Sequence, residues 1–400
     1  MTLVALLFLI ALQSLLTLIV LYQLAIIVLG FLTKERLARS LCARTRFAII
    51  IPAHNEECTV AQAVSSLLES DYAAKLRDIF VIADNCTDRT AEVARQSGAL
   101  CLERTDPKKG KGYTLQWTLE RIPKDRYDAF VFLDADSTVA PSFLYHLDHD
   151  IQGGKKAIQG YEVTKNPGDT WLTRLSDVSD FFQFQYYYRA RSKLGLSCRL
   201  LGNGMCFSRE IIANFGWDAF SIGEDGEYYM KLILGEYIVH YNPMARFFSE
   251  RAVDFTQGKP QRLRWMTGKA EVVRRYIPVL VVNALRKADI RQLDAAVEFL
   301  LPSQSMLLGM IFLAFSFQYW VNMESLLVWL IGIVIVIASY IGVAVVTGGF
   351  PYETYKAMLF APVYVLWKIW LRVQSIFRKE RRWVKTERRA TYNSSGIDRR

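Results

Sequence analysis

The chain has 400 residues, of which 52% are hydrophobic and 22% are charged, and its formal net charge is +10. This composition suits a soluble domain joined to membrane segments better than a plain globular protein. The positive excess lies in two short segments, Lys34–Arg46 and Arg378–Arg400, while the long region between them is nearly neutral. A nucleic-acid-binding protein is therefore disfavoured, because its cations would be expected across the folded domain.

Residues 1–33 contain no Asp, Glu, Lys or Arg. Because about 20 apolar residues suffice to cross a bilayer, this segment predicts an N-terminal transmembrane helix. No basic residue precedes the apolar run, and the run is too long for a secretory signal peptide, which disfavours that alternative. Residues 34–46 follow as a basic linker, which the positive-inside rule places in the cytosol.

The region after the linker alternates short apolar runs with amphipathic stretches. Predicted strands cover Phe47–Ile51, which Pro52 is expected to end, Ile79–Ala83, Ala99–Leu102 and Ala129–Leu133. Predicted helices between them cover Glu56–Glu69, Asp88–Ser97 and Gly110–Arg121. This alternation indicates an α/β domain over residues 47–275, with a doubly wound and mostly parallel sheet. In such a sheet, ligands bind beyond the carboxyl ends of the strands.

Carboxylates follow two of these predicted strands. Asp134 and Asp136 lie two residues apart after the fourth strand, so in extended geometry both would project to the same side. Mg²⁺ prefers carboxylate oxygens together with substrate phosphates, which makes this pair a candidate metal site. Asp84 follows the second strand, where it could read the base or ribose of a nucleotide. The structural alternatives are a turn or helix cap for Asp134 and Asp136, and an Asx turn for Asp84.

Three further motifs carry basic, glycine or acidic residues. The loop "DPKKGKGY" brings Lys111 to a position where it could face a diphosphate, with a solvated basic loop as the alternative. The motif "GNG" at Gly202–Gly204 would let an acceptor approach the backbone, or would form only a tight turn. Glu224 and Asp225 begin a predicted helix, where they either cap the helix or supply a general base for a sugar hydroxyl.

The motif "QRLRW", residues 261–265, is the most specific feature of the sequence. Helical spacing sets Gln261, Arg264 and Trp265 on adjoining faces. An arginine can hold a diphosphate by paired, charge-assisted hydrogen bonds, and a tryptophan offers a flat apolar face to a sugar ring. The alternative is an Arg/Trp anchor at the membrane surface, because predicted membrane segments follow.

The last third of the chain predicts further membrane segments. Residues 276–298 are expected to form an interfacial helical segment, and residues 299–352 two transmembrane helices joined by a turn at Asn322–Ser325. Residues 353–377, interrupted by Lys368 and Arg372, predict an amphipathic helix in the interface. This three-span arrangement keeps the basic tail, residues 378–400, in the cytosol with the α/β domain, whereas a fourth span would place it outside. The six cysteines show no C-x-x-C spacing and are expected to stay reduced.

Taken in order, the motifs "PAHNE", "DNCTD", "GKG", "DAD", "GNG", "ED" and "QRLRW" resemble those of membrane-integrated family 2 glycosyltransferases, over Phe47 to Trp265. That group has the GT-A fold and includes the hyaluronan, chitin-oligosaccharide, poly-N-acetylglucosamine and cellulose synthases. The resemblance implies a UDP-sugar donor, Mg²⁺ or Mn²⁺ as cofactor, and a glycan or lipid acceptor. The chain departs from the pattern at Gly223, where many relatives have Thr, and at Asp84-Asn85, which replaces Asp-Asp.

The resemblance also implies a role for each matched residue. It assigns the uridine pocket to Pro52, Ala53, Glu56 and Asp84. It places Lys111 near the diphosphate, and Asp134 and Asp136 on the nucleotide and metal, with Asp136 as the direct ligand. It gives the acceptor entrance to Gly202, Asn203 and Gly204, and the role of catalytic base to Asp225, beside Glu224. It closes the site over diphosphate and acceptor with Gln261, Arg264 and Trp265.

Together these features predict an inverting glycosyltransferase that extends a β-linked polysaccharide from a cytosolic UDP-sugar. It would be an integral membrane protein, in the inner membrane if its source is bacterial, in contact with membrane lipids and with export or assembly partner proteins. Two alternatives stay open. One is transfer of a single sugar to a membrane lipid, as in ceramide glucosyltransferases, which the small number of predicted spans favours. The other is a non-catalytic membrane module that senses a nucleotide sugar.

Overall fold

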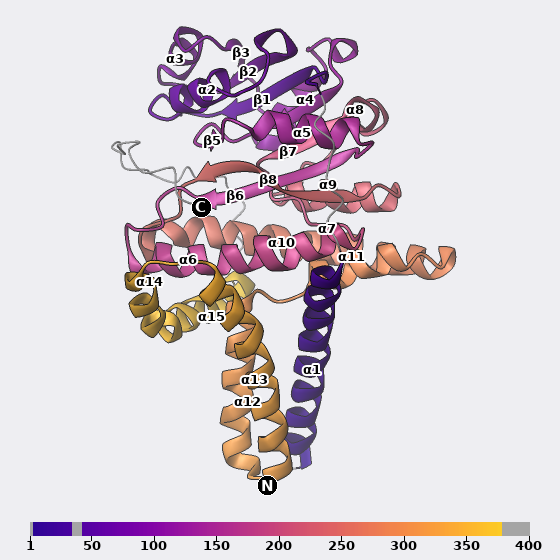
Figure 1. Cartoon of the computed structure of the whole chain (residues 1–400), viewed down its shortest axis with the longest axis vertical. Helices are drawn as coiled ribbons and strands as arrows, with labels where there is room; N and C mark the ends of the chain where they lie inside the picture. The colour runs from indigo at the N-terminus through magenta and orange to yellow at the C-terminus, as the bar shows by residue number, and fades with distance from the viewer. Residues whose placement is uncertain (1–2, 34–41, 378–400) are drawn as a thin grey trace.

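The computed structural model describes residues 3–33 and 42–377 (Figure 1). An α/β domain lies at one end of the molecule, long helices extend from the other end, and a layer of further helices lies between them. The predicted basic tail, residues 378–400, and most of the predicted basic linker lie outside the described residues.

The α/β domain is built on one mixed sheet. Its strands are β1 (Phe47–Ala53), β2 (Arg77–Asp84), β3 (Leu100–Arg104), β4 (Ala129–Phe132), β5 (Thr138–Val139), β6 (Ala157–Thr164), β7 (Met205–Ser208) and β8 (Val239–Ser249). Their order in the sheet is β3-β2-β1-β4-β7-β6-β8-β5. The first four are parallel, β7 is antiparallel to both neighbours, and β6 is parallel to β8. The predicted α/β sheet, parallel in its larger part, is confirmed.

Helices cover both faces of this sheet, which explains why its strands are continuous apolar runs. Phe47, Ile49 and Ile51 of β1 face a core that includes α2 (Val60–Leu68), α3 (Thr90–Gln96) and α5 (Phe143–Gln152). Ala48 and Ile50 face the opposite core, which includes α4 (Lys111–Leu119), α8 (Arg209–Phe215), α9 (Glu224–Leu234), α10 (Phe255–Lys287) and α11 (Ile290–Leu300). Each fully buried large apolar side chain stabilises the fold by roughly 1.5–3 kcal/mol.

The first strand does not end where the sequence predicts, because Pro52 lies inside β1. The backbone oxygen of Ile50 accepts a hydrogen bond from Leu133 on the β4 side, at 3.1 Å. Pro52, two residues on, faces the same side, and the pairing of β1 with β4 stops at Ile50. The N–H that proline lacks is therefore not needed there, and the strand continues along β2 alone.

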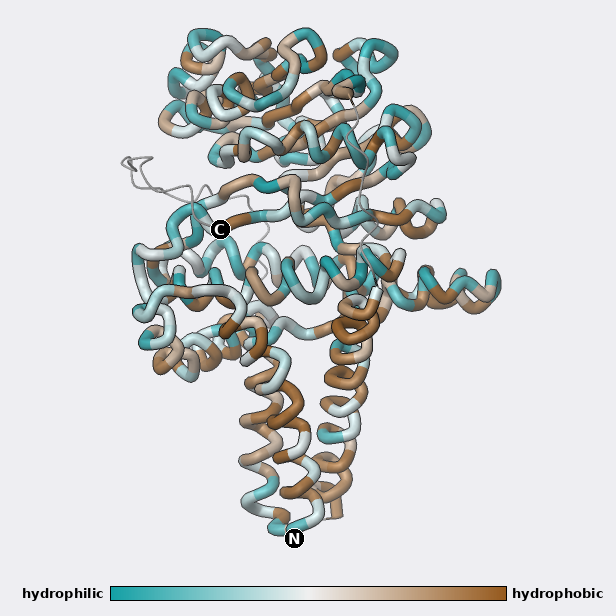
Figure 2. Tube along the Cα trace, viewed as in Figure 1, coloured by the Kyte–Doolittle hydropathy of each residue, from teal (hydrophilic) through white to brown (hydrophobic). Residues whose placement is uncertain are grey.

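Within residues 3–33 and 42–377, three helices are long and apolar enough to cross a membrane: α1 (Leu3–Leu32), α12 (Gln304–Val321) and α13 (Glu324–Thr347). Figure 2 shows them as the most hydrophobic part of the trace, beyond the domain, with a few polar positions along each helix. Asn322 adopts a left-handed conformation, φ 49°, and ends α12 two residues before α13 begins. The turn predicted at Asn322–Ser325 thus begins where expected and ends two residues earlier, at Met323.

The layer between the domain and the candidate spans is made of helices that do not point along the spans (Figure 1). It contains α6 (Trp171–Phe181), continued by a π-helical stretch (Phe182–Tyr188) and α7 (Arg189–Lys193), and also α14 (Tyr352–Ala357) and α15 (Ala361–Phe377). The aromatic run of the sequence thus serves packing, since Phe182 stacks on Tyr340 of α13 at 5.4 Å. Helix α10 runs unbroken across residue 275, so that predicted domain boundary does not coincide with the end of an element.

A buried ion pair ties the domain to α1. The Arg191 side chain of α7 is 0% exposed, and its Nη2 donates to Oδ2 of Asp294 in α11 at 2.5 Å. Its Nη1 donates to the Tyr22 hydroxyl of α1 at 2.6 Å, and Tyr22 donates in turn to Asp294 Oδ1 at 2.6 Å. Arg191 Nε and Nη2 donate to the backbone oxygen of Ser197. This network joins three helices that are distant in sequence.

Candidate active site

Asp134 and Asp136 follow β4 in a turn, not in the extended geometry that the sequence predicts. The N–H of Ser137 donates to the backbone oxygen of Asp134 at 3.1 Å, which closes the turn. The two carboxylates are therefore not placed on one side by strand alternation. The strand ends because its neighbour β7 pairs only as far as Phe132.

Buried Asn203 holds this turn in place. Its Oδ1 accepts from the N–H of Asp134 at 3.0 Å, and its Nδ2 donates to Ser137 Oγ at 2.8 Å. The family resemblance predicts Asn203 at the acceptor entrance. In the structure both polar atoms of its side chain are engaged inside the protein, so its structural role is to position Asp134.

Lys111 reaches the same turn from the first residue of α4. Its Nζ forms an ion pair with Asp134 Oδ1 and donates to the backbone oxygen of Gly202 at 2.5 Å. Burial alone would lower the pKa of Lys111, but the carboxylates of Asp134 and Glu224 outweigh it and raise that pKa above its ordinary value. Lys111 is therefore a fixed cation beside the predicted diphosphate position.

The glycines of the "GNG" motif are required by their geometry. Gly204 has φ +64°, and a Cβ there would lie 2.1 Å from the Phe247 ring. Gly202 has φ +78°, and its backbone lies against the carboxylate of Asp225. The backbone oxygens of all three motif residues accept hydrogen bonds, from Lys111, Gln159 and the N–H of Gly160. An acceptor would therefore meet no free carbonyl in this motif.

Glu224 and Asp225 form the first turn of α9, as predicted. Asp225 Oδ1 accepts from the N–H of Gly226 at 2.7 Å. Burial raises the pKa of Asp225, opposed by that hydrogen bond and by the cations Arg199, Lys111 and Arg264. Burial and the charge of Asp225 raise the pKa of Glu224 to about 7, opposed by Lys111 and Arg264. Two carboxyls and these cations therefore share one poorly solvated site.

Replacing Glu224 with glutamine is expected to stabilise the protein at pH 8 and to change little at pH 5. The pKa of Glu224 in the fold, about 7, lies above the ordinary value of 4.5, so the folded protein binds the proton more tightly than the unfolded chain. That contribution is complete below about pH 4.5 and is lost as the pH rises through 7. The expected gain at pH 8 is on the order of 3 kcal/mol. Thermal unfolding at both pH values measures it, and an equal shift at both would contradict this account.

The helix that carries "QRLRW" crosses the start of α9 at a pair of glycines. A Cβ on Gly268 would lie 2.8 Å from the backbone nitrogen of Gly223, so neither position leaves room for a side chain without a shift. This close crossing gives a physical reason for Gly223 at the position where many relatives carry Thr. It brings Arg264 within electrostatic reach of Glu224 and Asp225, whereas the Trp265 side chain stays 49% exposed.

The predicted uridine pocket lies at the ends of β1 and β2. The Asp84 carboxylate accepts from Arg104 at 2.6 Å and from Thr114 at 2.7 Å, so both of its oxygens are engaged within the chain. Ala53 is buried, and Pro52 is partly exposed. Glu56 accepts from Thr59 Oγ1 at 2.9 Å. The structure thus brings the four residues to one edge of the sheet and gives Asp84 a structural partner.

Two buried residues of the site region had no signal in the sequence. Arg104, at the end of β3, fixes Asp84 by a buried ion pair. Glu227 accepts from the N–H groups of Phe220 and Ser221 at 3.1 and 2.9 Å and from the Tyr276 hydroxyl at 2.8 Å. It thereby ties α9 to α10 behind the candidate base. Arg104 contacts Asp84 from another strand, and Glu227 contacts Tyr276 from another helix. The spacing of residues along the sequence does not reveal such contacts.

The residues of the predicted metal site could hold an ion only if the substrate supplied the remaining ligands. In residues 3–33 and 42–377, no cluster of three or more His, Cys, Asp or Glu side chains could hold a metal ion. Asp134 is paired with Lys111, and Asp136 Oδ1 accepts from Ser137 Oγ at 3.3 Å. Two carboxylates at one turn suit Mg²⁺ or Mn²⁺ when substrate phosphates supply further ligands.

Comparison with known families decides the identity of the domain. The model of the family described as "Glycosyltransferase like family 2" matches residues 44–268, which is more than half of the chain. The chain belongs to glycosyltransferase family 2. The family 2 domain includes every residue that the sequence analysis placed in the site, from Pro52 to Trp265.

Named family 2 relatives are similar to this chain over the same region. An N-acetylglucosaminyltransferase of Rhizobium leguminosarum bv. viciae is 27% identical over 250 residues, 58% of this chain and 57% of the relative. A poly-β-1,6-N-acetyl-D-glucosamine synthase of Staphylococcus epidermidis is 25% identical over 259 residues, 61% of each. The chain thus spans less than two thirds of the length of these relatives. They identify the enzyme class as a glycosyltransferase.

A solved structure supports the fold of the family 2 domain. A mannosyltransferase of Pyrobaculum calidifontis, in complex with GDP-Man and Mn²⁺, matches with a TM-score of 0.51 and 17% sequence identity. The match covers 80% of this chain and 97% of that structure. The GT-A glycosyltransferase fold predicted from the motifs is confirmed.

Proposed function

We propose that this family 2 enzyme is an inverting glycosyltransferase that uses a UDP-sugar to extend a β-linked polysaccharide. The observation that carries the proposal is the convergence of the candidate base Asp225 with the cations Lys111 and Arg264, beyond the carboxyl ends of the strands. This arrangement can accept a proton and hold a departing diphosphate in one place. The relatives named for N-acetylglucosamine transfer and polymerisation support a polymer product.

In the proposed reaction, the acceptor hydroxyl oxygen attacks the anomeric carbon of the donor sugar. Its proton passes to the carboxylate of Asp225, and the bond from the anomeric carbon to the diphosphate oxygen breaks. Lys111 and Arg264 stabilise the charge that develops on the diphosphate. The burial that raises the pKa of Asp225 makes its carboxylate a stronger base than an exposed one.

The remaining predicted residues complete the donor side. Pro52, Ala53, Glu56 and Asp84 would line the uridine pocket, and Gln261 would help close the site. Mg²⁺ or Mn²⁺ would be held by Asp136 and Asp134 together with the donor phosphates, and when bound it supplies further stabilisation of the leaving charge.

The acceptor side is proposed to run from Gly202–Gly204 to Trp265. The half-exposed indole of Trp265 offers a flat apolar surface to a sugar ring. Because the three carbonyls of Gly202–Gly204 are engaged inside the protein, these residues would meet the acceptor through shape alone or through their N–H groups.

The enzyme is proposed to lie in a membrane, with the family 2 domain in the cytosol, where nucleotide sugars are made. Three helices are long and apolar enough to span, and the basic segments next to them favour this orientation. Three spans leave little room for a polymer channel, so export would need partner proteins. The same feature favours the second candidate function, transfer of one sugar to a membrane lipid.

The purified full chain, tested with a panel of UDP-sugars and Mn²⁺, is expected to release UDP with at least one donor. Chelation of the metal by EDTA is expected to reduce the rate at least 100-fold, and Mn²⁺ or Mg²⁺ should restore it. A gel then sizes the product. A long product supports the polysaccharide synthase, and a single glycolipid band overturns it in favour of lipid transfer. Release that EDTA does not change would contradict the proposed metal site.

A further inference from the structure

Three cations from different elements lie within electrostatic reach of one another near the start of α12. Lys269 is on α10, one turn after Trp265; Arg199 precedes β7; and Arg372 is on α15. The Arg199 guanidinium and the Lys269 ammonium both lie 5.6 Å from the centroid of the Phe299 ring. Lys269 Nζ also donates to the backbone oxygen of Leu301 at 3.1 Å, just before α12 begins. We call Arg199, Lys269 and Arg372 the vestibule cations.

The three vestibule cations outnumber the two carboxylates beside them, Glu298 and, next to Arg199, Asp225. Glu298, which is buried, accepts from the Tyr188 hydroxyl at 3.5 Å, and its Oε2 has no hydrogen-bond partner within the described residues. Burial, together with repulsion from Arg199 and Arg372, lowers the pKa of Lys269 to about 7, although Glu298 opposes this. A bound anion would offset the repulsion among these cations and would keep Lys269 protonated.

Apolar surface adjoins the cluster on the side of the candidate spans. α15 packs on α12 where Ile369 meets Gly309, so that a Cβ on the glycine would lie 2.8 Å from the isoleucine. Leu308 on α12 and Leu366 and Val373 on α15 are exposed near this contact. An anionic ligand that approaches the cations from this side would need a hydrocarbon part to cover these exposed apolar residues.

We infer that the vestibule cations bind the phosphate group of a membrane lipid. Arginine and lysine together recognise phosphate oxygens well, because guanidinium donates paired hydrogen bonds and ammonium adds a point charge. The donor diphosphate does not explain the cluster, since Lys111 and Arg264 already serve it. Because one helical turn rises about 5.4 Å, the phosphate would lie about one sugar ring from Trp265. The inference rests on the proposed function and adds a lipid partner to its acceptor side.

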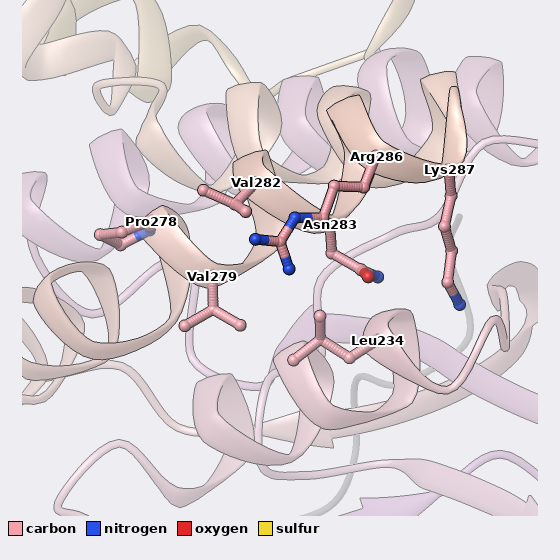
Figure 3. Close-up of a pocket in the computed structure, with 7 residues that line it drawn as sticks. All are labelled: Leu234, Pro278, Val279, Val282, Asn283, Arg286 and Lys287. Atoms are coloured by element: carbon pink, nitrogen blue, oxygen red, sulfur yellow. The ribbon is translucent and has the colours of Figure 1, made fainter.

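A second pair of basic residues on α10 provides a control for the binding experiment. Arg286 and Lys287 line a shallow groove of about 520 Å³ with Leu234, Pro278, Val279, Val282 and Asn283 (Figure 3). Lys287 is already paired with Glu236, at 2.6 Å. Arg286→Gln therefore removes one cation from the same helix without touching the vestibule.

The test is native mass spectrometry of the full chain in detergent, titrated with phosphatidic acid or with diacylglycerol of the same acyl chains. The expected result is that phosphatidic acid binds and diacylglycerol does not, with binding at least tenfold weaker in Lys269→Gln and restored in Lys269→Arg. Arg286→Gln should bind like the unchanged chain. Equal binding of both lipids, no loss in Lys269→Gln, no recovery in Lys269→Arg, or an equal loss in Arg286→Gln would each overturn the inference.

Competition with inorganic phosphate separates the two sources of the anion. If free phosphate displaces phosphatidic acid at a similar concentration, the site is one for free phosphate and the lipid assignment is wrong. Lipid binding is measured without any UDP-sugar, so its failure is distinct from failure of the proposed function. UDP release without lipid binding overturns the lipid site alone, and lipid binding without UDP release from any donor overturns the transferase proposal alone.

Discussion

Replacing Asp225 with asparagine is expected to lower the rate of sugar transfer by about 10²–10⁴-fold, the contribution typical of a general base. The amide keeps the shape of the side chain and an oxygen that can accept from the N–H of Gly226, so the start of α9 should stay folded. It cannot take the proton of an acceptor hydroxyl. UDP release at saturating donor measures the rate, and calorimetry of donor binding checks that the donor site is intact.

Asp125→Asn serves as the matched control, because Asp125 is exposed in the short 3₁₀ turn Lys124–Arg126 before β4, whereas Asp134 follows the opposite end of that strand. Its rate should stay within a factor of two of the unchanged enzyme. If Asp225→Asn keeps more than a tenth of the activity, Asp225 is not the base. Glu224, its neighbour with a raised pKa, then becomes the candidate for that role.

Replacing Arg191 with methionine is expected to destabilise the protein by about 3–5 kcal/mol. The Arg191 side chain is 0% exposed, and that of Asp294 is 10% exposed. Without the guanidinium, the Asp294 carboxylate would stay buried with only the Tyr22 hydroxyl to stabilise its charge. The loss should appear as an earlier unfolding transition, measured by thermal or chemical denaturation in detergent.

The double variant Arg191→Met/Asp294→Asn should recover part of this loss, because it removes the unpaired buried charge. Arg209→Met is the comparison at the surface, where Arg209 and Asp128 form an ion pair with both side chains 47% exposed. It should cost at most about 1 kcal/mol. Equal losses in Arg191→Met and Arg209→Met would mean that burial of the pair near α1 does not matter.

The sequence could predict the parts of the fold that depend on local pattern. The strands at Phe47 and Ala129 are apolar runs because both faces of the sheet are covered, and a run of that kind is visible in one dimension. The three candidate spans could be predicted for a similar reason. The length of an apolar segment can be read from the sequence without knowing which other segments contact it. The order of the motifs also predicted that Pro52, Asp84 and Asp134 lie at the carboxyl ends of strands, and the structure has them there.

What the sequence could not predict depends on contacts between distant segments. The turn at Asp134 is set by Asn203, which lies 69 residues away, so the extended geometry expected for the two aspartates was wrong. The polarity of α11 is a second case. Its buried side carries Gln292 and Glu298, whereas Ile290 and Val297 are exposed, because its polar residues face partners in the protein interior. From the hydrophobic periodicity alone, one would predict that Ile290 and Val297 face the protein interior.

If α1 crosses a membrane, as proposed, its length links the candidate site to the thickness of the bilayer. Its 30 residues make a helix of about 45 Å, whereas the 18 residues of α12 make about 27 Å, close to the hydrocarbon core of about 30 Å. The excess is held by the domain, since Tyr22 bonds to Asp294 and the backbone of Gly30 abuts Ala190. In a thicker bilayer, α1 could not adjust its tilt without turning the domain with it. Hydrophobic mismatch would therefore change the height and orientation of the active site above the lipid surface.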